Sequence, residues 1–131
     1  MNRIKILMAD DEPDVLEIMA RKVAAAGYEV VQAADGQEAW DKIVAEKPDV
    51  VLLDLTMPRL HGFEVLEKLR RNPPGEKWCP VIIVSAHDEL ANLQKSFELE
   101  AEHYLTKPCS VEEILKAIDI VVALSAQRKK E

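Results

Sequence analysis

Side chains capable of chemistry recur directly after short apolar segments of this chain. They are two adjacent carboxylates, a third carboxylate, a hydroxyl and an ammonium group, supplied by Asp10, Asp11, Asp54, Ser85 and Lys107. Clustered carboxylates repel one another unless a cation joins them, and their hard oxygens suit Mg²⁺, which leaves room for water and phosphate. If these groups converge, the ammonium and hydroxyl groups could stabilise a phosphoryl group, with Asp54 as the nucleophile.

Each of these residues also has an ordinary structural explanation. Asp10 and Asp11 could be helix-capping acids, and Asp54 could be a cap on the loop that follows it. Ser85 could be the polar end of a strand, and Lys107 a solvated loop lysine. All of these residues, however, follow predicted strands at the same edge of the sheet. One shared site explains this arrangement better than several unrelated structural roles do.

The segment before Asp54 determines where that carboxylate lies. Residues 50–53 form a continuous apolar run with two β-branched members, as expected for a strand buried on both faces of a parallel sheet. Pro58 hinders continuation of this strand, so the chain should turn there. Asp54 is therefore expected at the carboxyl end of a central strand, where open α/β sheets bind their ligands.

The hydrophobic pattern predicts four more strands and five helices. The strands are expected at Ile4–Ala9, Tyr28–Ala33, Val81–Ser85 and Glu102–Thr106, the last being more polar and at the sheet edge. Helical spacing is found in Leu16, Met19 and Val23; Ala39, Trp40, Ile43 and Val44; Phe63, Leu66 and Leu69; Leu90, Leu93 and Phe97; and Val111, Ile114, Ile118 and Val121. This alternation predicts a doubly wound α/β fold, with a five-stranded parallel sheet and helices on both faces.

Composition limits the class of protein. A chain of 131 residues, 48% hydrophobic, suits one domain over 1–131, with a core at 4–124 and a charged tail at 125–131. The net charge of -7 argues against direct nucleic-acid binding. No apolar run approaches about 18 residues and no signal peptide is visible, so we expect a cytoplasmic protein without membrane contact. Cys79 and Cys109 lack metal-site spacing, and we expect reduced thiols.

Taken together, the motifs resemble a response-regulator receiver domain over residues 4–124. The matching segments are Asp10–Pro13, Asp35–Ala39, Asp54–Pro58 with Gly62, Ser85–Ala86 and Tyr104–Pro108. The resemblance implies a CheY-like, flavodoxin-like fold with strand order 2-1-3-4-5. It also implies a phosphoprotein switch of two-component phosphorelay signal transduction.

The resemblance further implies roles for the site residues. Asp54 would accept a phosphoryl group from a sensor histidine kinase or a histidine phosphotransfer protein. Asp11, Asp54 and the backbone carbonyl of Thr56 would hold Mg²⁺, or Mn²⁺ in its place, and Asp10 would assist through water. Thr56 and His87 are candidates for setting the lifetime of the aspartyl phosphate.

The same resemblance implies a switching face. Lys107 would pair with Asp54 and then with the phosphate, Ser85 would move to bind a phosphoryl oxygen, and Tyr104 would turn inward behind it. This would remodel the face made by the fourth helix, fifth strand and fifth helix, for a downstream target, an output domain or a phosphorylation-dependent homodimer. Ile120 and Leu124 of the last helix either line the core edge or contribute to such an interface.

Three positions depart from the family pattern. Glu100 stands where glycine is common, which brings the local turn geometry into question. Cys109 follows the Lys-Pro pair where an aromatic residue is frequent. The loop at 72–79 is somewhat long and contains Trp78, so it is a candidate contact surface specific to this chain.

Two other functions fit the sequence less well. A phosphatase of the haloacid-dehalogenase type also uses a strand-end aspartate, Mg²⁺ and lysine, but it needs a second aspartate where this chain has Thr56, and it commonly carries a cap domain. A flavodoxin-like cofactor binder would need a phosphate loop, whereas the first strand here leads into Asp10, Asp11 and Glu12. We therefore expect a protein that catalyses only its own phosphorylation and dephosphorylation, and not a turnover enzyme.

Overall fold

Strands and helices alternate along the whole chain in the computed structural model, which describes residues 3–55, 57, 59–86 and 90–130. The strands are β1 (Lys5–Ala9), β2 (Glu29–Ala33), β3 (Val50–Asp54), β4 (Val81–Ser85) and β5 (His103–Thr106). The helices are α1 (Pro13–Ala25), α2 (Gly36–Glu46), α3 (Gly62–Arg71), α4 (Leu90–Glu98) and α5 (Val111–Lys130). Each predicted element is present, with boundaries shifted by a few residues.

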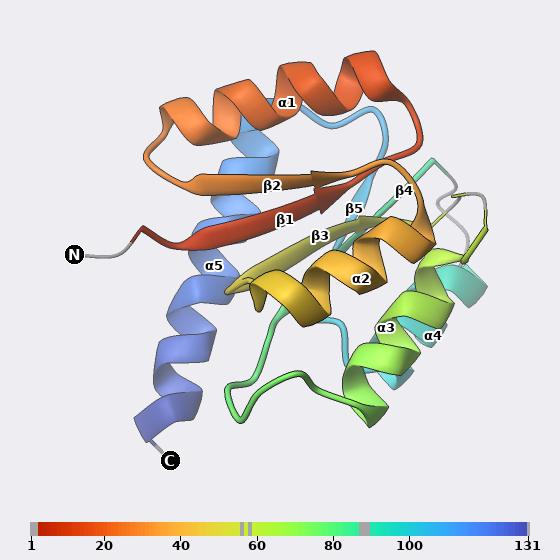
Figure 1. Ribbon diagram of the computed structural model, residues 1–131, viewed down its shortest axis with the longest axis vertical. Coiled ribbons are helices and arrows are strands. Elements are labelled where there is room, and N and C mark those ends of the chain that lie inside the picture. Colours follow the sequence, from red (N-terminus) through yellow and green to blue (C-terminus); the bar gives the residue numbers. More distant parts are fainter. Residues whose placement is uncertain (1–2, 56, 58, 87–89, 131) are drawn as a thin grey trace.

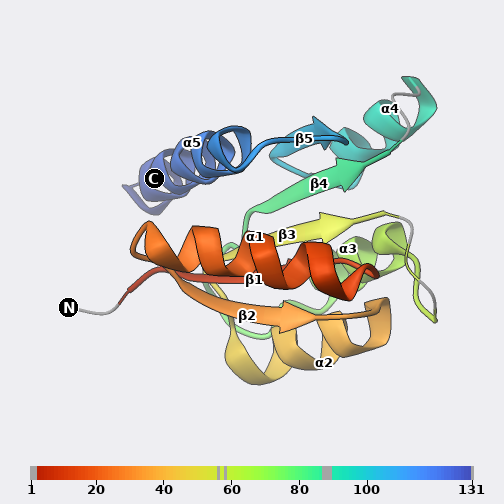
Figure 2. The ribbon, with the colours of Figure 1, turned by 90° about the horizontal axis from the view of Figure 1, so that it is seen from above.

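The five strands form one parallel sheet in the order β2-β1-β3-β4-β5. This confirms the doubly wound fold, the strand order and the edge position of β5 (Figure 1). Figure 2 shows the strand arrows pointing the same way, so their carboxyl ends share one edge of the sheet. Because β3 lies between β1 and β4, its last residue is central on that edge.

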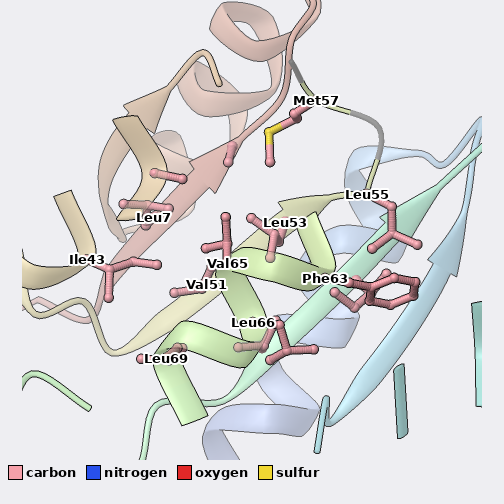
Figure 3. Close-up of a cluster of buried hydrophobic side chains, with 14 of the residues drawn as sticks. Leu7, Ile43, Val51, Leu53, Leu55, Met57, Phe63, Val65, Leu66 and Leu69 are labelled. Carbon is pink, nitrogen blue, oxygen red and sulfur yellow. The ribbon is translucent and has the colours of Figure 1, made fainter. Parts of the chain in front are cut away.

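The strands alternate between two hydrophobic clusters, one on each face of the sheet. Val51 and Leu53 of β3 belong to the first core cluster, which includes residues of α2 and α3 (Figure 3). Val50 and Leu52 belong to the second core cluster, with residues of α1 and α5. Each fully buried Leu or Val side chain contributes about 2 kcal/mol. Since strand side chains alternate with a period of two, Asp54 follows Val50 and Leu52 toward the α1 and α5 face.

Two helices, α4 and α5, differ from the predicted pattern near their C-terminal ends. Phe97 belongs to the apolar spacing that predicts α4, yet it is 51% exposed, so this apolar position of the helix is not covered by the core. The helix lies at the β4–β5 side of the sheet (Figure 2). The helix α5 continues to Lys130, so the charged segment predicted beyond the core is helical through residue 130. Across the described residues, none of the helices is both long enough and apolar enough to span a membrane.

A side-chain network fastens the α3–β4 loop at the amino edge of the sheet. The Glu102 carboxylate accepts hydrogen bonds from Arg70 Nη2 (3.1 Å), from the Val81 backbone N–H (3.1 Å) and from Trp78 Nε1 (2.6 Å). The Arg70 guanidinium also stacks on the Trp78 ring at 3.9 Å. Trp78 is half-buried inside this network, and the contact surface at this loop stays a prediction.

Glu100 has left-handed backbone geometry, with φ of 64°. This conformation costs a non-glycine residue about 1 kcal/mol, whereas glycine adopts it freely. Glycine also makes the unfolded chain more flexible, which lowers the free energy of unfolding by about 0.5 kcal/mol. We expect Glu100→Gly to raise the free energy of unfolding by about 0.5 kcal/mol, as measured by urea denaturation. The carbonyl of residue 100, which accepts from Arg70 Nη2 at 2.8 Å, is retained in the variant. Glu98→Gly, at the last residue of α4, is the control and should be destabilising.

Cys79 is a half-buried cysteine at the same edge of the sheet. Burial raises its pKa to about 12, so the thiol stays neutral in the folded protein while the unfolded chain ionises near its ordinary value of 9.0. The unfolded state then binds fewer protons above pH 9, and stability falls with rising pH up to the folded pKa. We expect wild-type stability to fall by about 1 kcal/mol per pH unit above pH 9 relative to Cys79→Ala, measured by urea denaturation at each pH. Parallel pH profiles for the two proteins would contradict this assignment.

Candidate functional site

The carboxyl ends of β1, β3 and β5 bring three of the predicted site residues into contact. Lys107 Nζ lies 2.8 Å from Asp54 Oδ2 and 3.1 Å from Asp10 Oδ2. Asp54 is only 4% exposed, at the end of the fully buried strand β3. Lys107 is 53 positions from Asp54 and 97 positions from Asp10 in the chain. The parallel sheet thus brings distant residues together into one charged centre, as predicted.

Opposing effects determine the charge state of Lys107. Burial lowers its pKa, but the hydrogen bond to Asp54 and the negative charges of Asp54 and Asp10 raise it by more. The net result is a pKa above the ordinary value of 10.5, so the ammonium group remains charged at neutral pH. A permanent positive charge is thereby held against a buried carboxylate.

An acidic cluster lies beside this pair. Carboxylate oxygens of Asp10, Asp11 and Glu12 lie within 4.8 Å of one another, and the Glu12 backbone N–H donates to Asp10 Oδ1 at 2.9 Å. Glu12 Oε1 also lies 4.0 Å from Lys107 Nζ. Hard oxygen donors at this spacing fit Mg²⁺ in ligand type. Glu12 was not among the predicted site residues, although its position directly after Asp10 and Asp11 could have indicated it.

Two glycines let the loop after Asp54 pack between the starts of α2 and α3. A Cβ on Gly36 would lie 1.7 Å from the Leu60 carbonyl oxygen. A Cβ on Gly62 would lie 2.7 Å from the Asp54 carbonyl oxygen, and the Gly62 N–H donates to the Leu55 carbonyl at 3.0 Å. The backbone that carries Asp54 is therefore in direct contact with both helix starts.

Side chains strengthen the same contacts. Asp35 caps α2 by accepting from the Glu38 N–H at 2.8 Å, and it pairs with Arg59 of the loop at 3.4 Å. His61 caps α3, because its Nδ1 accepts from the Phe63 N–H at 3.1 Å. These residues contribute to the site through the position of the loop and not through chemistry.

Ser85 and Tyr104 lie on the β4 and β5 side of the site. Ser85 is 1% exposed, and its carbonyl accepts from the Lys107 N–H at 2.7 Å. Tyr104 is half-buried and packs against the first core cluster. The structure thus connects Ser85 to Lys107 through the backbone. Thr56 and His87, also predicted as site residues, lie outside the described residues.

The site thus combines a doubly wound parallel sheet with an acidic cluster and an Asp–Lys pair at its carboxyl edge. The family described as the response regulator receiver domain matches residues 6–119, and the chain belongs to this family. It is therefore a receiver domain of the two-component type, as the sequence motifs predict. The family match favours this class over the haloacid-dehalogenase alternative.

Named relatives and solved structures agree with this assignment. The chain is 35% identical over 125 residues to the alkaline phosphatase synthesis transcriptional regulatory protein PhoP of Bacillus subtilis, covering 95% of this chain and 50% of the relative. It is 38% identical over 112 residues to response regulator MprA of Mycobacterium tuberculosis, covering 86% and 47%. The chain spans about half the length of the curated relatives it matches.

Two solved structures share the fold over nearly their whole length. A CheY-like receiver domain protein from Methanospirillum hungatei JF-1 has a TM-score of 0.89 and 28% identity, covering 97% of this chain and 99% of that one. Vibrio cholerae chemotaxis protein CheY4 has a TM-score of 0.85 and 30% identity, covering 92% and 99%. Both structures support the CheY-like fold.

Proposed function

We propose that this chain is a phosphoryl-accepting switch whose Asp54 receives a phosphoryl group from a sensor histidine kinase or a histidine phosphotransfer protein. The observation that carries the proposal is the buried Asp54 carboxylate held 2.8 Å from Lys107 Nζ beside an acidic cluster. Membership of the receiver family supports the same role.

The reaction uses the Asp54 carboxylate as nucleophile. One of its oxygens attacks the phosphorus of a phosphohistidine, the P–N bond breaks, and its electron pair stays on the imidazole nitrogen, which takes a proton from water as it leaves. Lys107 then stabilises the negative charge on the transferred group, to which its ammonium group is already close. Hydrolysis by water on phosphorus returns the carboxylate and inorganic phosphate, with Thr56 and His87 as the candidates that set this rate. The chain is a switch and not a turnover enzyme.

The carboxylates also suit a divalent cation. Asp10, Asp11, Asp54 and the Thr56 backbone carbonyl would hold Mg²⁺, or Mn²⁺ in its place. Such an ion, when bound, supplies positive charge to the carboxylates and to the phosphoryl oxygens. Glu12 adds a further carboxylate within reach of this group.

The output face is proposed to consist of α4, β5 and α5. Ser85 and Tyr104 would convey phosphorylation to this face by changing their positions. Apolar side chains are exposed on its helices, with Phe97 at 51%, Ile120 at 40% and Leu124 at 47%. These side chains suit a downstream protein, an output domain or a second phosphorylated copy.

Intact-mass analysis after incubation with acetyl phosphate and Mg²⁺ tests the acceptor. We expect the wild type to gain the mass of one phosphoryl group and Asp54→Asn to gain none, since the amide cannot form the acyl phosphate. Asp41→Asn, at an exposed position of α2, is the matched control and should be phosphorylated like the wild type. A wild type without mass gain, or a phosphorylated Asp54→Asn, would contradict the proposal.

A further inference from the structure

A cavity of about 410 Å³ opens next to Asp54, between α1, the strand ends and the segment that joins β5 to α5. Side chains of α1, α5 and the sheet form its inner wall. They are Met8, Leu16, Leu52, Val84 and Ile114, and each is at most 6% exposed. The cavity therefore extends inward toward the second core cluster instead of lying across a flat surface.

The lining of this cavity also includes four charged side chains, whose summed charge is negative. Asp10, Glu12 and Asp54 contribute three carboxylates to the lining and Lys107 one ammonium group, so two negative charges are left over. The chain as a whole carries a formal charge of -7, which also attracts cations toward it. A cavity with an apolar interior and a few charged groups at one end orients a ligand that has an apolar part and a charged part.

Cys109 forms part of the wall of the same cavity. It stands directly after the Lys-Pro pair, where the sequence departs from the more frequent aromatic residue. A small side chain here leaves apolar surface without packing partners, and unfilled cavities reduce stability in proportion to their volume. Apolar cavities of smaller size than this one bind compounds such as benzene.

We propose that this cavity binds a small organic cation, whose apolar body fills the space between α1 and α5 and whose ammonium group pairs with Asp10 and Glu12. The volume lies within the range of about 300–1,000 Å³ that is typical of small-molecule sites. It is more than the space that one protein side chain would fill. Binding itself requires neither a phosphoryl donor nor a metal ion, so it can be tested separately from the proposed function.

The consequence for signalling rests on the proposed function. An ammonium group at Asp10 occupies carboxylate oxygens that would otherwise serve the divalent cation. The ligand would then compete with Mg²⁺ and slow the phosphorylation of Asp54, which makes the cavity an inhibitory site.

Calorimetric titration with three probes of matched shape tests the site, in buffer without metal or phosphoryl donor. The probes are 2-phenylethylammonium, the neutral 2-phenylethanol and the anionic 3-phenylpropionate. We expect the cation to bind about tenfold more tightly than the alcohol, and the carboxylate most weakly, because of the two excess negative charges. The cation should also slow alkylation of Cys109 by iodoacetamide. 3-Phenylpropionate, the probe expected to bind most weakly, should slow this alkylation least and is the control.

Variants locate the ligand. Cys109→Phe should weaken binding at least about tenfold, because its ring occupies part of the space that the ligand needs, and Cys109→Met, a smaller change, should weaken binding less if the phenylalanine variant does not fold. Glu12→Gln should reduce the preference for the cation over the alcohol about fivefold. Glu17→Gln, an exposed carboxylate elsewhere on α1, should leave that preference unchanged.

Equal affinities for the three probes, or unchanged binding in folded Cys109→Phe or Cys109→Met, would overturn the proposal. So would alkylation of Cys109 at the same rate with and without 2-phenylethylammonium. Binding of a neutral capped peptide with one phenylalanine, without binding of 2-phenylethylammonium, would assign the cavity to a side chain of a partner protein and would also overturn it.

Discussion

The Lys107→Met variant is expected to be phosphorylated on Asp54 about 10²–10³ times more slowly than the wild type. Lys107 Nζ lies 2.8 Å from the acceptor carboxylate, and its raised pKa keeps it charged. A charge held in advance next to the transferring group stabilises the transition state without reorganisation. Methionine has a similar length and an uncharged end, so the substitution removes the charge and largely keeps the volume.

Single-turnover rates from intact mass at saturating acetyl phosphate measure this effect. Lys116→Met, at an exposed position of α5, is the control and should react at the wild-type rate. Removal of one partner of a buried pair also leaves Asp54 without its cation, so stability should fall by about 3 kcal/mol. Urea denaturation gives the folded fraction of the variant, and the phosphorylation rate is divided by this fraction. A folded variant with an unchanged rate would show that Lys107 does not assist the transfer.

The Gly36→Ala variant is expected to lose about 3 kcal/mol or more of its free energy of unfolding. Its Cβ would lie 1.7 Å from the Leu60 carbonyl oxygen, which is a backbone atom and cannot swing aside as a side chain would. Either the start of α2 or the loop after Asp54 must then move. We therefore expect a slower phosphorylation of Asp54 as well, even in the part of the sample that is folded.

Gly75→Ala is the matched control, because a Cβ at that position has no atom within 4 Å. Its stability should be unchanged or slightly higher, since alanine restricts the unfolded chain. Urea denaturation of both variants at pH 7 makes the comparison. Equal stability of the two would mean that the α2 start and the acceptor loop can separate at little cost.

The strands and the meeting of Asp10, Asp54 and Lys107 could be predicted from the sequence for a local reason. Buried strands show as short apolar runs, and parallel strands place their carboxyl ends on one edge. Residues at those ends are therefore brought together whatever their separation in the chain. Pattern alone could not give the hydrogen bonds of Lys107, which depend on side-chain positions.

Contacts between distant segments could not be predicted in the same way. Glu102 binds Trp78 and Arg70, which are 24 and 32 positions earlier, and no periodicity links these residues. The close approach of Gly36 to Leu60 depends on how two loops pack. Phe97 shows a related limit, because helical spacing reveals an apolar face but not whether another element covers it.

The contribution of β5 to the charged centre has a consequence for the order in which the chain is made. A ribosome completes Asp10 and Asp54 long before it reaches Lys107, so a nascent chain has these carboxylates without the ammonium group that contacts them here. Burial of an unpaired carboxylate is unfavourable. The charged centre around Asp54 can therefore form only after the segment with Lys107 has been made, so its completion coincides with completion of the sheet.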